Sequence, residues 1–142
     1  MSEPVYHPAR RKARKRALDV LYEADMRGLP PLHVLASART RLQPPVPEYY
    51  AYTESLVRGV VEHAARVDEL ISSYAEGWTL DRMPPVDRNI CRIAVYELLW
   101  VDEVDDAVAI SEAVELASTL STDDSPRYLN GLLGRIAEYA TR

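Results

Sequence analysis

A cluster of basic side chains near the N-terminus is the strongest functional signal in this 142-residue chain. Six of the seven residues from 10 to 16 are basic: Arg10, Arg11, Lys12, Arg14, Lys15 and Arg16. The whole chain carries a formal net charge of -5, so the cluster is a local exception on an acidic body. A segregated basic segment of this kind is typical of binding to nucleic acid at one place. We therefore predict that these six residues bind RNA.

The same cluster is unfavourable as a helix. Its charged residues repeat four positions apart, and each like-charge pair at this spacing disfavours a helix by roughly 0.2–0.5 kcal/mol. The basic residues fall on all sides of a helical wheel, so we expect no face of residues 10–16 to be buried. An apolar stripe begins at Ala17 and includes Leu18, Leu21 and Ala24, by which we expect the helix to dock. Such a local conflict is typical of a functional site, and a merely solvated tail is the alternative.

Other reactive residue types are sparse. The histidines His7, His33 and His63 lie far apart, and no His or Cys has metal-ligand spacing, so we predict no metal site. The single cysteine, Cys91, cannot form an internal disulfide and lies in an apolar helical pattern, which predicts a small core residue. Glycine-rich phosphate loops and serine-hydrolase motifs are absent. The sequence therefore predicts a protein that is not an enzyme and needs no cofactor.

Helical periodicity runs through nearly the whole chain, so we predict an all-α fold. The prolines of residues 44–47 mark the best internal boundary. Ser125 is expected to cap the last helix, and Gly131 and Gly134 to mark close packing by another helix. The expected helices cover about 8–26, 31–42, 47–74, 85–101, 111–120 and the segment from 125 onward, with a short turn near Trp78 and an acidic loop at 102–106.

The chain also lacks the signals of membrane insertion. No uninterrupted apolar run approaches the ~18 residues that a membrane-spanning helix needs. The N-terminus has no apolar core of the kind found in signal peptides. We therefore expect a cytoplasmic protein without membrane contact.

The aromatic composition is unusual, because the chain has nine tyrosines and no phenylalanine. Tyrosine rings stack on RNA bases, although Tyr49, Tyr52 and Tyr96 lie in apolar patterns that are typical of a core. Tyr128 differs, because it falls in the first turn of the last expected helix, where backbone N–H groups attract phosphate. We predict that Tyr128 contacts RNA, and packing in the core is the alternative.

Four segments have the order and spacing of a known family. They read RRKARKRALDVLYEAD, DRNICRIAVYELLW, AVAISEAVELA and SPRYLNGLLGRI. Together they closely resemble the signature blocks of the NusB family of bacterial transcription antitermination factors, over about residues 8 to 138. The resemblance implies two roughly perpendicular three-helix bundles with an arginine-rich N-terminal helix. It also implies one domain over 1–142, divided into helical parts at about 8–74 and 78–142.

The resemblance further implies a binding function. Members pair with the ribosomal protein NusE, bind the single-stranded boxA element of ribosomal RNA leaders and act on RNA polymerase in an antitermination complex. By position, the arginine-rich motif falls on residues 10–16, and Tyr74 and Tyr128 are further implied RNA contacts. Tyr22 and Asp87 are implied partner contacts, with Asp87 standing where the family often has glutamate and Tyr128 where phenylalanine is common. Members occur as monomers and as dimers, so a homodimer is one option.

Three other functions fit parts of the sequence. An RNA-binding module related to the N-terminal domain of an RNA methyltransferase would share the helical pattern, although we expect no further chain for a cofactor site. A DNA-binding repressor would prefer duplex DNA to RNA. A helical adaptor that binds only proteins would show no RNA crosslinks.

Overall fold

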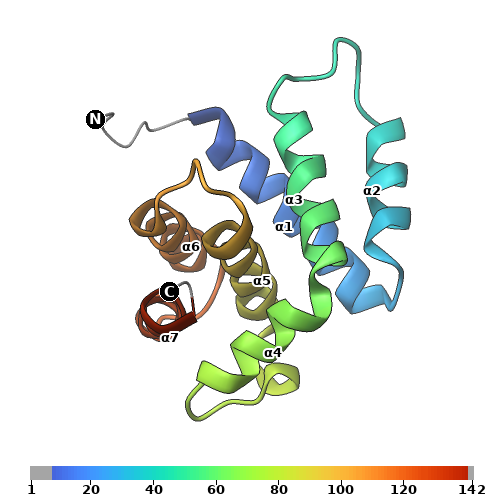
Figure 1. The fold of residues 1–142 in the computed structure, drawn as a ribbon. Coiled ribbons are helices and arrows are strands. Elements are labelled where there is room, and N and C mark those ends of the chain that lie inside the picture. Colours follow the sequence, from blue (N-terminus) through green and yellow to red (C-terminus); the bar gives the residue numbers. More distant parts are fainter. Residues whose placement is uncertain (1–7, 141–142) are drawn as a thin grey trace.

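The protein is all-α over residues 8–140, which are the residues that the computed structural model describes. Within this range it has seven α-helices, one short 3-10 helix and no strand, and Figure 1 shows their arrangement. The all-α prediction is confirmed. The elements are α1 (Pro8–Arg27), α2 (Pro31–Thr40), α3 (Tyr50–Glu62), α4 (Ala64–Tyr74), η1 (Leu80–Arg82), α5 (Pro85–Trp100), α6 (Asp106–Leu120) and α7 (Ser125–Ala140).

The helices pack as two groups that meet along α5. Helices α1, α2 and α3 contact one another, as do α5, α6 and α7. Helices α1 and α3 also pack on α5, which joins the groups, and α4 packs on α5 and α7. In Figure 1, α2 lies at one edge of the molecule, with α6 and α7 at the other. The division of the chain at residues 74–78 stays a prediction.

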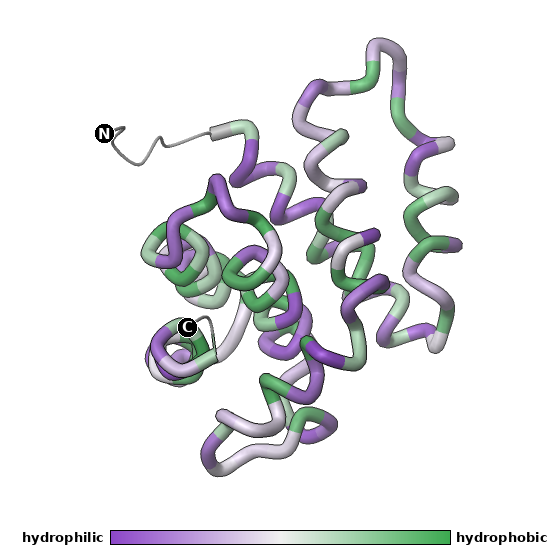
Figure 2. Tube along the Cα trace, viewed as in Figure 1, coloured by the Kyte–Doolittle hydropathy of each residue, from purple (hydrophilic) through white to green (hydrophobic). Residues whose placement is uncertain are grey.

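Buried apolar side chains form one continuous core shared by both groups. Figure 2 shows hydrophobic residues on the faces that the helices turn toward one another. Cys91 is completely buried, and burial raises the pKa of its thiol, which confirms it as a small core residue. Among residues 8–140, no helix is both long enough and apolar enough to cross a membrane.

The single helix expected over residues 47–74 is wrong, because the chain breaks it at His63. There the backbone has φ -106° and ψ 19°, so α3 ends and α4 begins in a new direction (Figure 1). The His63 ring stacks on Trp100 of α5, with ring centroids 3.9 Å apart, and this contact fixes the corner. The apolar spacing continues unchanged across the corner, so periodicity alone gives no sign of it.

One further boundary and one helix cap differ from expectation in the C-terminal half of the chain. Helix α6 begins at Asp106 rather than near residue 111, because Val108 and Ala109 already donate helical hydrogen bonds to the Asp105 carbonyl. An acidic residue in the first turn also suits the positive end of the helix dipole. Ser125 is not a cap, since its buried hydroxyl bonds to Asp87 instead.

In the N-terminal half of the chain, Gly28 ends α1 with φ 66°, as predicted.

Close helix packing occurs at Gly59 rather than at the glycines of α7. A Cβ atom at Gly59 would lie 2.0 Å from Cζ of Tyr96, so the Tyr96 ring fills the space that any side chain would need. The expectation for Gly131 and Gly134 is wrong. The nearest atom to a Cβ at Gly131 is the flexible Nη1 of Arg135 at 3.3 Å, and a Cβ at Gly134 would meet nothing within 4 Å.

These glycines give a matched pair of substitutions. We expect Gly59→Ala to lower the free energy of unfolding by about 1–3 kcal/mol, because the new methyl group must displace the Tyr96 ring. We expect Gly134→Ala to raise it by about 0.5–1 kcal/mol, because alanine favours the helix and has room there. Urea unfolding of both variants measures the difference. Equal effects would contradict the close approach of α3 and α5.

Candidate nucleic-acid interface

The basic cluster lies in the first half of α1, and the structure divides it into buried and exposed members. The expectation that no face of this stretch is buried is wrong, because Ala13 and Arg14 are 0% and 3% exposed. The hydroxyl of Thr53 in α3 donates to the Ala13 carbonyl at 3.0 Å, which holds this turn of α1 against α3. The first half of α1 therefore docks as well as the second.

Arg14 forms a buried ion pair with Glu97 of α5. Its Nε atom lies 2.9 and 3.1 Å from the two carboxylate oxygens, and the Tyr52 hydroxyl donates to the same carboxylate. Burial alone would lower the pKa of Arg14, but the hydrogen bond and charge of Glu97 outweigh it and leave the pKa raised. Arg14 therefore connects α1 to α5. That Arg14 binds RNA stays a prediction, which its burial disfavours.

Arg10 and Arg11 are partly neutralised by acidic residues of the C-terminal group. Arg11 contacts Glu112 of α6 through two nitrogens, at 3.0 and 3.2 Å. Arg10 lies 3.7 Å from Glu103 and stacks its guanidinium over the Tyr52 ring, 4.7 Å from the centroid. An RNA phosphate that binds either arginine must compete with these carboxylates.

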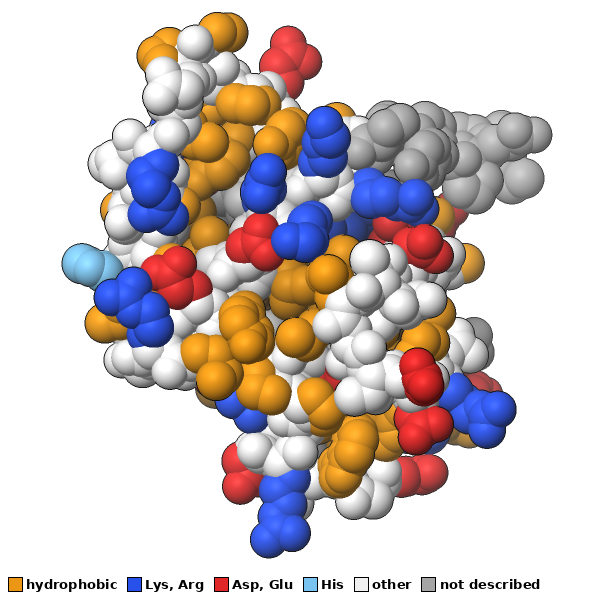
Figure 3. All heavy atoms as spheres, turned by 180° about the vertical axis from the view of Figure 1, so that it is seen from behind, with side chains coloured by type: hydrophobic (Ala, Val, Ile, Leu, Met, Phe, Trp, Pro, Cys, Tyr) orange, Lys and Arg blue, Asp and Glu red, His pale blue; other side chains and the backbone are white. Residues whose placement is uncertain are grey.

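The other three basic residues form what we call the exposed basic face: Lys12, Lys15 and Arg16. Lys15 Nζ and Arg16 Nη1 both donate to the Asp19 carboxylate of the next turn, at 2.6 and 3.4 Å. Lys12 and Arg16 are exposed. Ion pairs between such exposed side chains are weak and are screened by salt. Figure 3 shows several Lys and Arg side chains gathered in the upper part of this view. This face is therefore the part of α1 best placed to meet phosphates.

Tyr74 and Tyr128, the two predicted aromatic contacts, are half-buried and belong to a different part of the surface. Tyr128 packs against Trp78, with ring centroids 5.1 Å apart and its hydroxyl buried. Tyr74 stacks parallel to Tyr139, with centroids 6.5 Å apart. Trp78 and Tyr139 are themselves exposed. The structure therefore places the predicted RNA contacts in two groups, one basic on α1 and one aromatic around α4 and α7.

The two predicted partner contacts differ sharply in exposure. Tyr22 is 39% exposed on α1, and Met26, one turn further, is 54% exposed, so together they offer an apolar surface. Asp87 is completely buried, where its carboxylate accepts hydrogen bonds from the Ser121 and Ser125 hydroxyls. Its direct contact with a partner stays a prediction that this burial disfavours.

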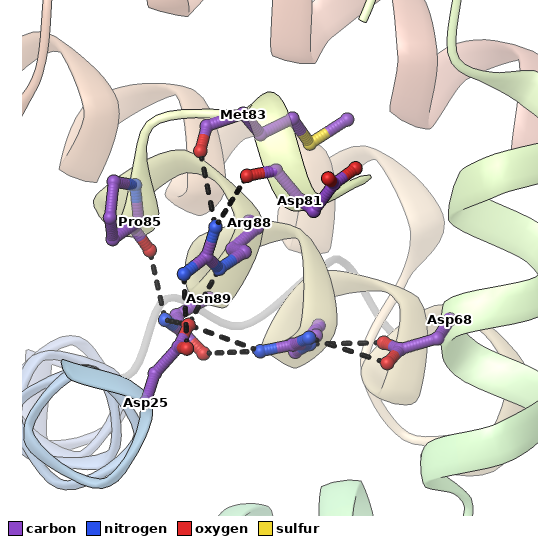
Figure 4. Close-up of polar contacts among 8 residues, drawn as sticks. Asp25, Asp68, Asp81, Met83, Pro85, Arg88 and Asn89 are labelled. Carbon is purple, nitrogen blue, oxygen red and sulfur yellow. Dashed lines mark hydrogen bonds and ion pairs between the residues drawn. The ribbon is translucent and has the colours of Figure 1, made fainter. Parts of the chain in front are cut away.

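A polar network that the sequence analysis missed joins α1, α4 and α5 (Figure 4). Arg88 binds the Asp25 carboxylate through Nε at 2.6 Å and Nη2 at 3.0 Å. Arg92 reaches Asp68 at 3.0 Å and Asp25 at 3.4 Å, and the Asn89 amide donates to Asp25 at 2.9 Å. The hydrogen bond from Arg88 is the main reason that the pKa of Asp25 is lowered. The network holds the second half of α1 in place behind the exposed basic face.

Metal-ligating side chains are not gathered in the described part of the chain. No group of three or more His, Cys, Asp or Glu side chains within residues 8–140 is placed to hold a metal ion. His7, one of the three histidines considered, lies outside the described residues. The chemistry that the site can perform is the binding of anions and aromatic rings.

Comparison with known proteins decides the family. The model of the NusB family matches residues 11–138 of this chain. The chain belongs to the NusB family. A transcription antitermination protein NusB of Salinispora tropica is 74% identical, over 95% of this chain and 99% of its own length. The NusB of Thermobifida fusca is 56% identical, over 92% of this chain and 89% of its own.

Solved structures of the NusB family have the same fold. The T. maritima NusB superposes with a TM-score of 0.84 at 32% identity, covering 95% of this chain and 94% of that one. A complex of the antitermination factors NusB and NusE with double-stranded RNA contains a chain that matches with a TM-score of 0.81 at 25% identity. That match covers 94% of this chain and 98% of the other.

The buried Asp87 gives a prediction that separates folding from partner binding. We expect Asp87→Ala to lower the free energy of unfolding by about 2–3 kcal/mol, because the Ser121 and Ser125 hydroxyls lose a charged acceptor. Asp123→Ala, at an exposed position of the loop that joins α6 to α7, should change the free energy of unfolding by less than about 0.5 kcal/mol. Urea unfolding measures both values. Unchanged stability together with weaker NusE binding would make Asp87 a partner contact instead.

Proposed function

We propose that this chain is an RNA-binding transcription antitermination factor and not an enzyme. The observation that carries the proposal is the exposed basic face, which presents three basic side chains on one side of α1 in a protein of net charge -5. The acidic remainder repels RNA, so binding is directed to this face. Membership of the NusB family supports the same function. Such a factor works where transcription takes place, so we propose a cytoplasmic location.

We further propose that the RNA is single-stranded boxA RNA of ribosomal leaders and that NusE is the protein partner within the antitermination complex on RNA polymerase. The solved complex of NusB and NusE with double-stranded RNA supports NusE as the partner and RNA as the ligand, and the single-stranded boxA element is what the resemblance to the family implies. In this chain the exposed pair Tyr22 and Met26 is the best surface for the partner, because large exposed apolar side chains mark protein interfaces.

Tyr74 and Tyr128 complete the proposed RNA contact through the exposed edges of their aromatic pairs. We expect Tyr128→Ala to weaken RNA binding by the folded protein about tenfold or more, because stacking on a base is worth ~1–3 kcal/mol. Tyr128→Phe keeps the ring and should bind as the wild type does. Fluorescence anisotropy with labelled RNA measures the affinities. A loss of stability in Tyr128→Ala with unchanged affinity would assign the ring to the core alone.

Titration of labelled boxA RNA with the protein, with and without NusE, tests the function directly. We expect weak binding by the protein alone, and tighter binding with better discrimination against a scrambled RNA when NusE is present, because the acidic body limits the contact that one subunit makes. Equal discrimination with and without NusE would contradict the partner requirement. A preference for duplex DNA would indicate a repressor. Failure to bind RNA even with NusE would overturn the proposed function.

A further inference from the structure

A hollow of about 210 Å³ lies between α1 and α2, beside the exposed basic face. Its lining is partly apolar and partly charged, and it includes two arginines, Arg16 from α1 and Arg41 just after α2. Figure 3 shows such an apolar hollow with basic side chains on both sides of it, in the upper left of the view. Because Arg16 belongs to the exposed basic face, the hollow is a continuation of that face. The apolar lining residues are Val20, Val34, Ala38 and Leu42.

Tyr50, the first residue of α3, also lines this hollow. It is 3% exposed, and within the described residues its buried hydroxyl makes no hydrogen bond. Buried polar groups are nearly always paired, so a hydroxyl without a partner beneath a pocket points to a ligand. The guanidinium of Arg39 lies 5.7 Å from the centre of the Tyr50 ring and holds the ring in place.

Two arginines and two carboxylates line the hollow. Its two acidic lining residues, Asp19 and Glu23, are already paired with basic neighbours on α1. Within residues 8–140 the Arg41 side chain donates only to the neutral Ser37 hydroxyl, so its charge is available to an anion. An apolar slot between two arginines suits a flat ring that carries phosphates on either side.

We propose that this hollow receives one unstacked base of the RNA strand that binds along α1. The proposal rests on the proposed function. At about 210 Å³ the hollow is smaller than the ~300–1,000 Å³ of pockets for larger ligands, which suits a single base. Single-stranded RNA is commonly recognised through bases that are turned out of the stack. The base lies on the apolar side chains of the hollow, and Arg16 and Arg41 bind the flanking phosphates. The Tyr50 ring turns on binding, so that its hydroxyl, buried in the free protein, meets the edge of the base.

An abasic scan combined with a filled pocket tests the inference. The RNA is a set of single-stranded boxA oligonucleotides in which one nucleotide at a time lacks its base but keeps its phosphate. Ala38→Leu fills the hollow without changing charge, and Ala36→Leu places the same side chain at an exposed position of the same helix. We expect one abasic position to weaken wild-type binding about tenfold and to have no effect on Ala38→Leu, while Ala36→Leu behaves as the wild type does.

Each other outcome overturns a definite part of the argument. If the wild type binds RNA but Ala38→Leu and Ala36→Leu respond alike to every abasic position, no base enters the hollow. If Ala38→Leu weakens only NusE binding, the occupant is a protein side chain. If nucleoside monophosphates bind saturably and only Ala38→Leu abolishes this, while RNA affinities are equal, the hollow is a site for free nucleotides. If the wild type binds no RNA, the proposed function itself is wrong.

Tyr50→Phe provides a second variant that keeps the ring and the fold. It removes only the unpaired hydroxyl, so its melting temperature should equal or exceed that of the wild type. We expect Tyr50→Phe to bind boxA RNA about threefold more weakly than the wild type does. With the one abasic oligonucleotide that does not weaken binding to Ala38→Leu, Tyr50→Phe and the wild type should have equal affinity. Unchanged RNA affinity in Tyr50→Phe would overturn the assigned role of the hydroxyl.

Discussion

Replacing Arg14 with alanine is expected to lower the free energy of unfolding by about 3–5 kcal/mol, the cost of leaving a buried charge unpaired. The Arg14 and Glu97 side chains are only 4% and 1% exposed, so water cannot solvate the carboxylate that the substitution leaves behind. The Tyr52 hydroxyl, which donates to Glu97, cannot neutralise the charge. Chemical denaturation followed by far-ultraviolet circular dichroism measures the loss.

Two variants make this result specific to the ion pair. Lys12→Ala, two residues away on the exposed basic face, should change stability by less than about 0.5 kcal/mol. The double variant Arg14→Met with Glu97→Leu removes both charges at similar volume and should recover most of the loss. If Arg14→Ala unfolds at the wild-type midpoint but binds RNA more weakly, Arg14 is an RNA contact and the structural role assigned to it is incorrect.

Reversing the charges of Lys12 and Arg16 to glutamate is expected to weaken RNA binding about a hundredfold and to leave stability nearly unchanged. Both side chains are exposed, and each reversal removes one proposed phosphate contact and adds a repulsive charge. If the three residues of the exposed basic face each neutralise one phosphate, the plot of log affinity against log salt has a slope of about -2 in the wild type. The double variant should lose most of this slope.

A charge-matched control separates the face from the net charge. Arg66→Glu with Arg82→Glu changes the total charge by the same amount at exposed positions outside α1. We expect this control to weaken RNA binding severalfold at most, because distant surface charges are screened within about 10 Å at 0.1 M salt. Equal losses in the two double variants would show that RNA responds to the overall charge and not to the exposed basic face.

The sequence predicts the helices well where the evidence is local. Apolar residues at helical spacing predict the all-α fold, and Gly28 predicts the end of α1, because both signals lie within a few residues of the feature they specify. The corner at His63 depends instead on a ring from α5, 37 residues later in the chain. No pattern around residue 63 contains that information.

The contrast between local signals and distant contacts also explains why the sequence did not predict the role of Arg14 or the polar network around Asp25. Arg14 belongs to the basic cluster by sequence, but its role is set by Glu97, 83 residues away. One local signal was available, because Ala13, Ala17 and Leu21 repeat four residues apart and extend the buried stripe upstream. The network around Asp25 gives no comparable signal, since its members come from three different helices.

The contacts of α1 with helices distant in sequence determine how the protein unfolds locally. Glu97 of α5, Glu112 of α6 and Thr53 of α3 all hold the basic half of α1, and Arg88 and Asn89 hold its other half. Detachment of α1 as a whole would break every one of these contacts at once. The backbone amides of α1 beyond its first turn should therefore exchange with deuterium only when the whole domain unfolds, at the same rate as those of α5. The helix that we propose binds RNA is then among the last parts of the protein to open.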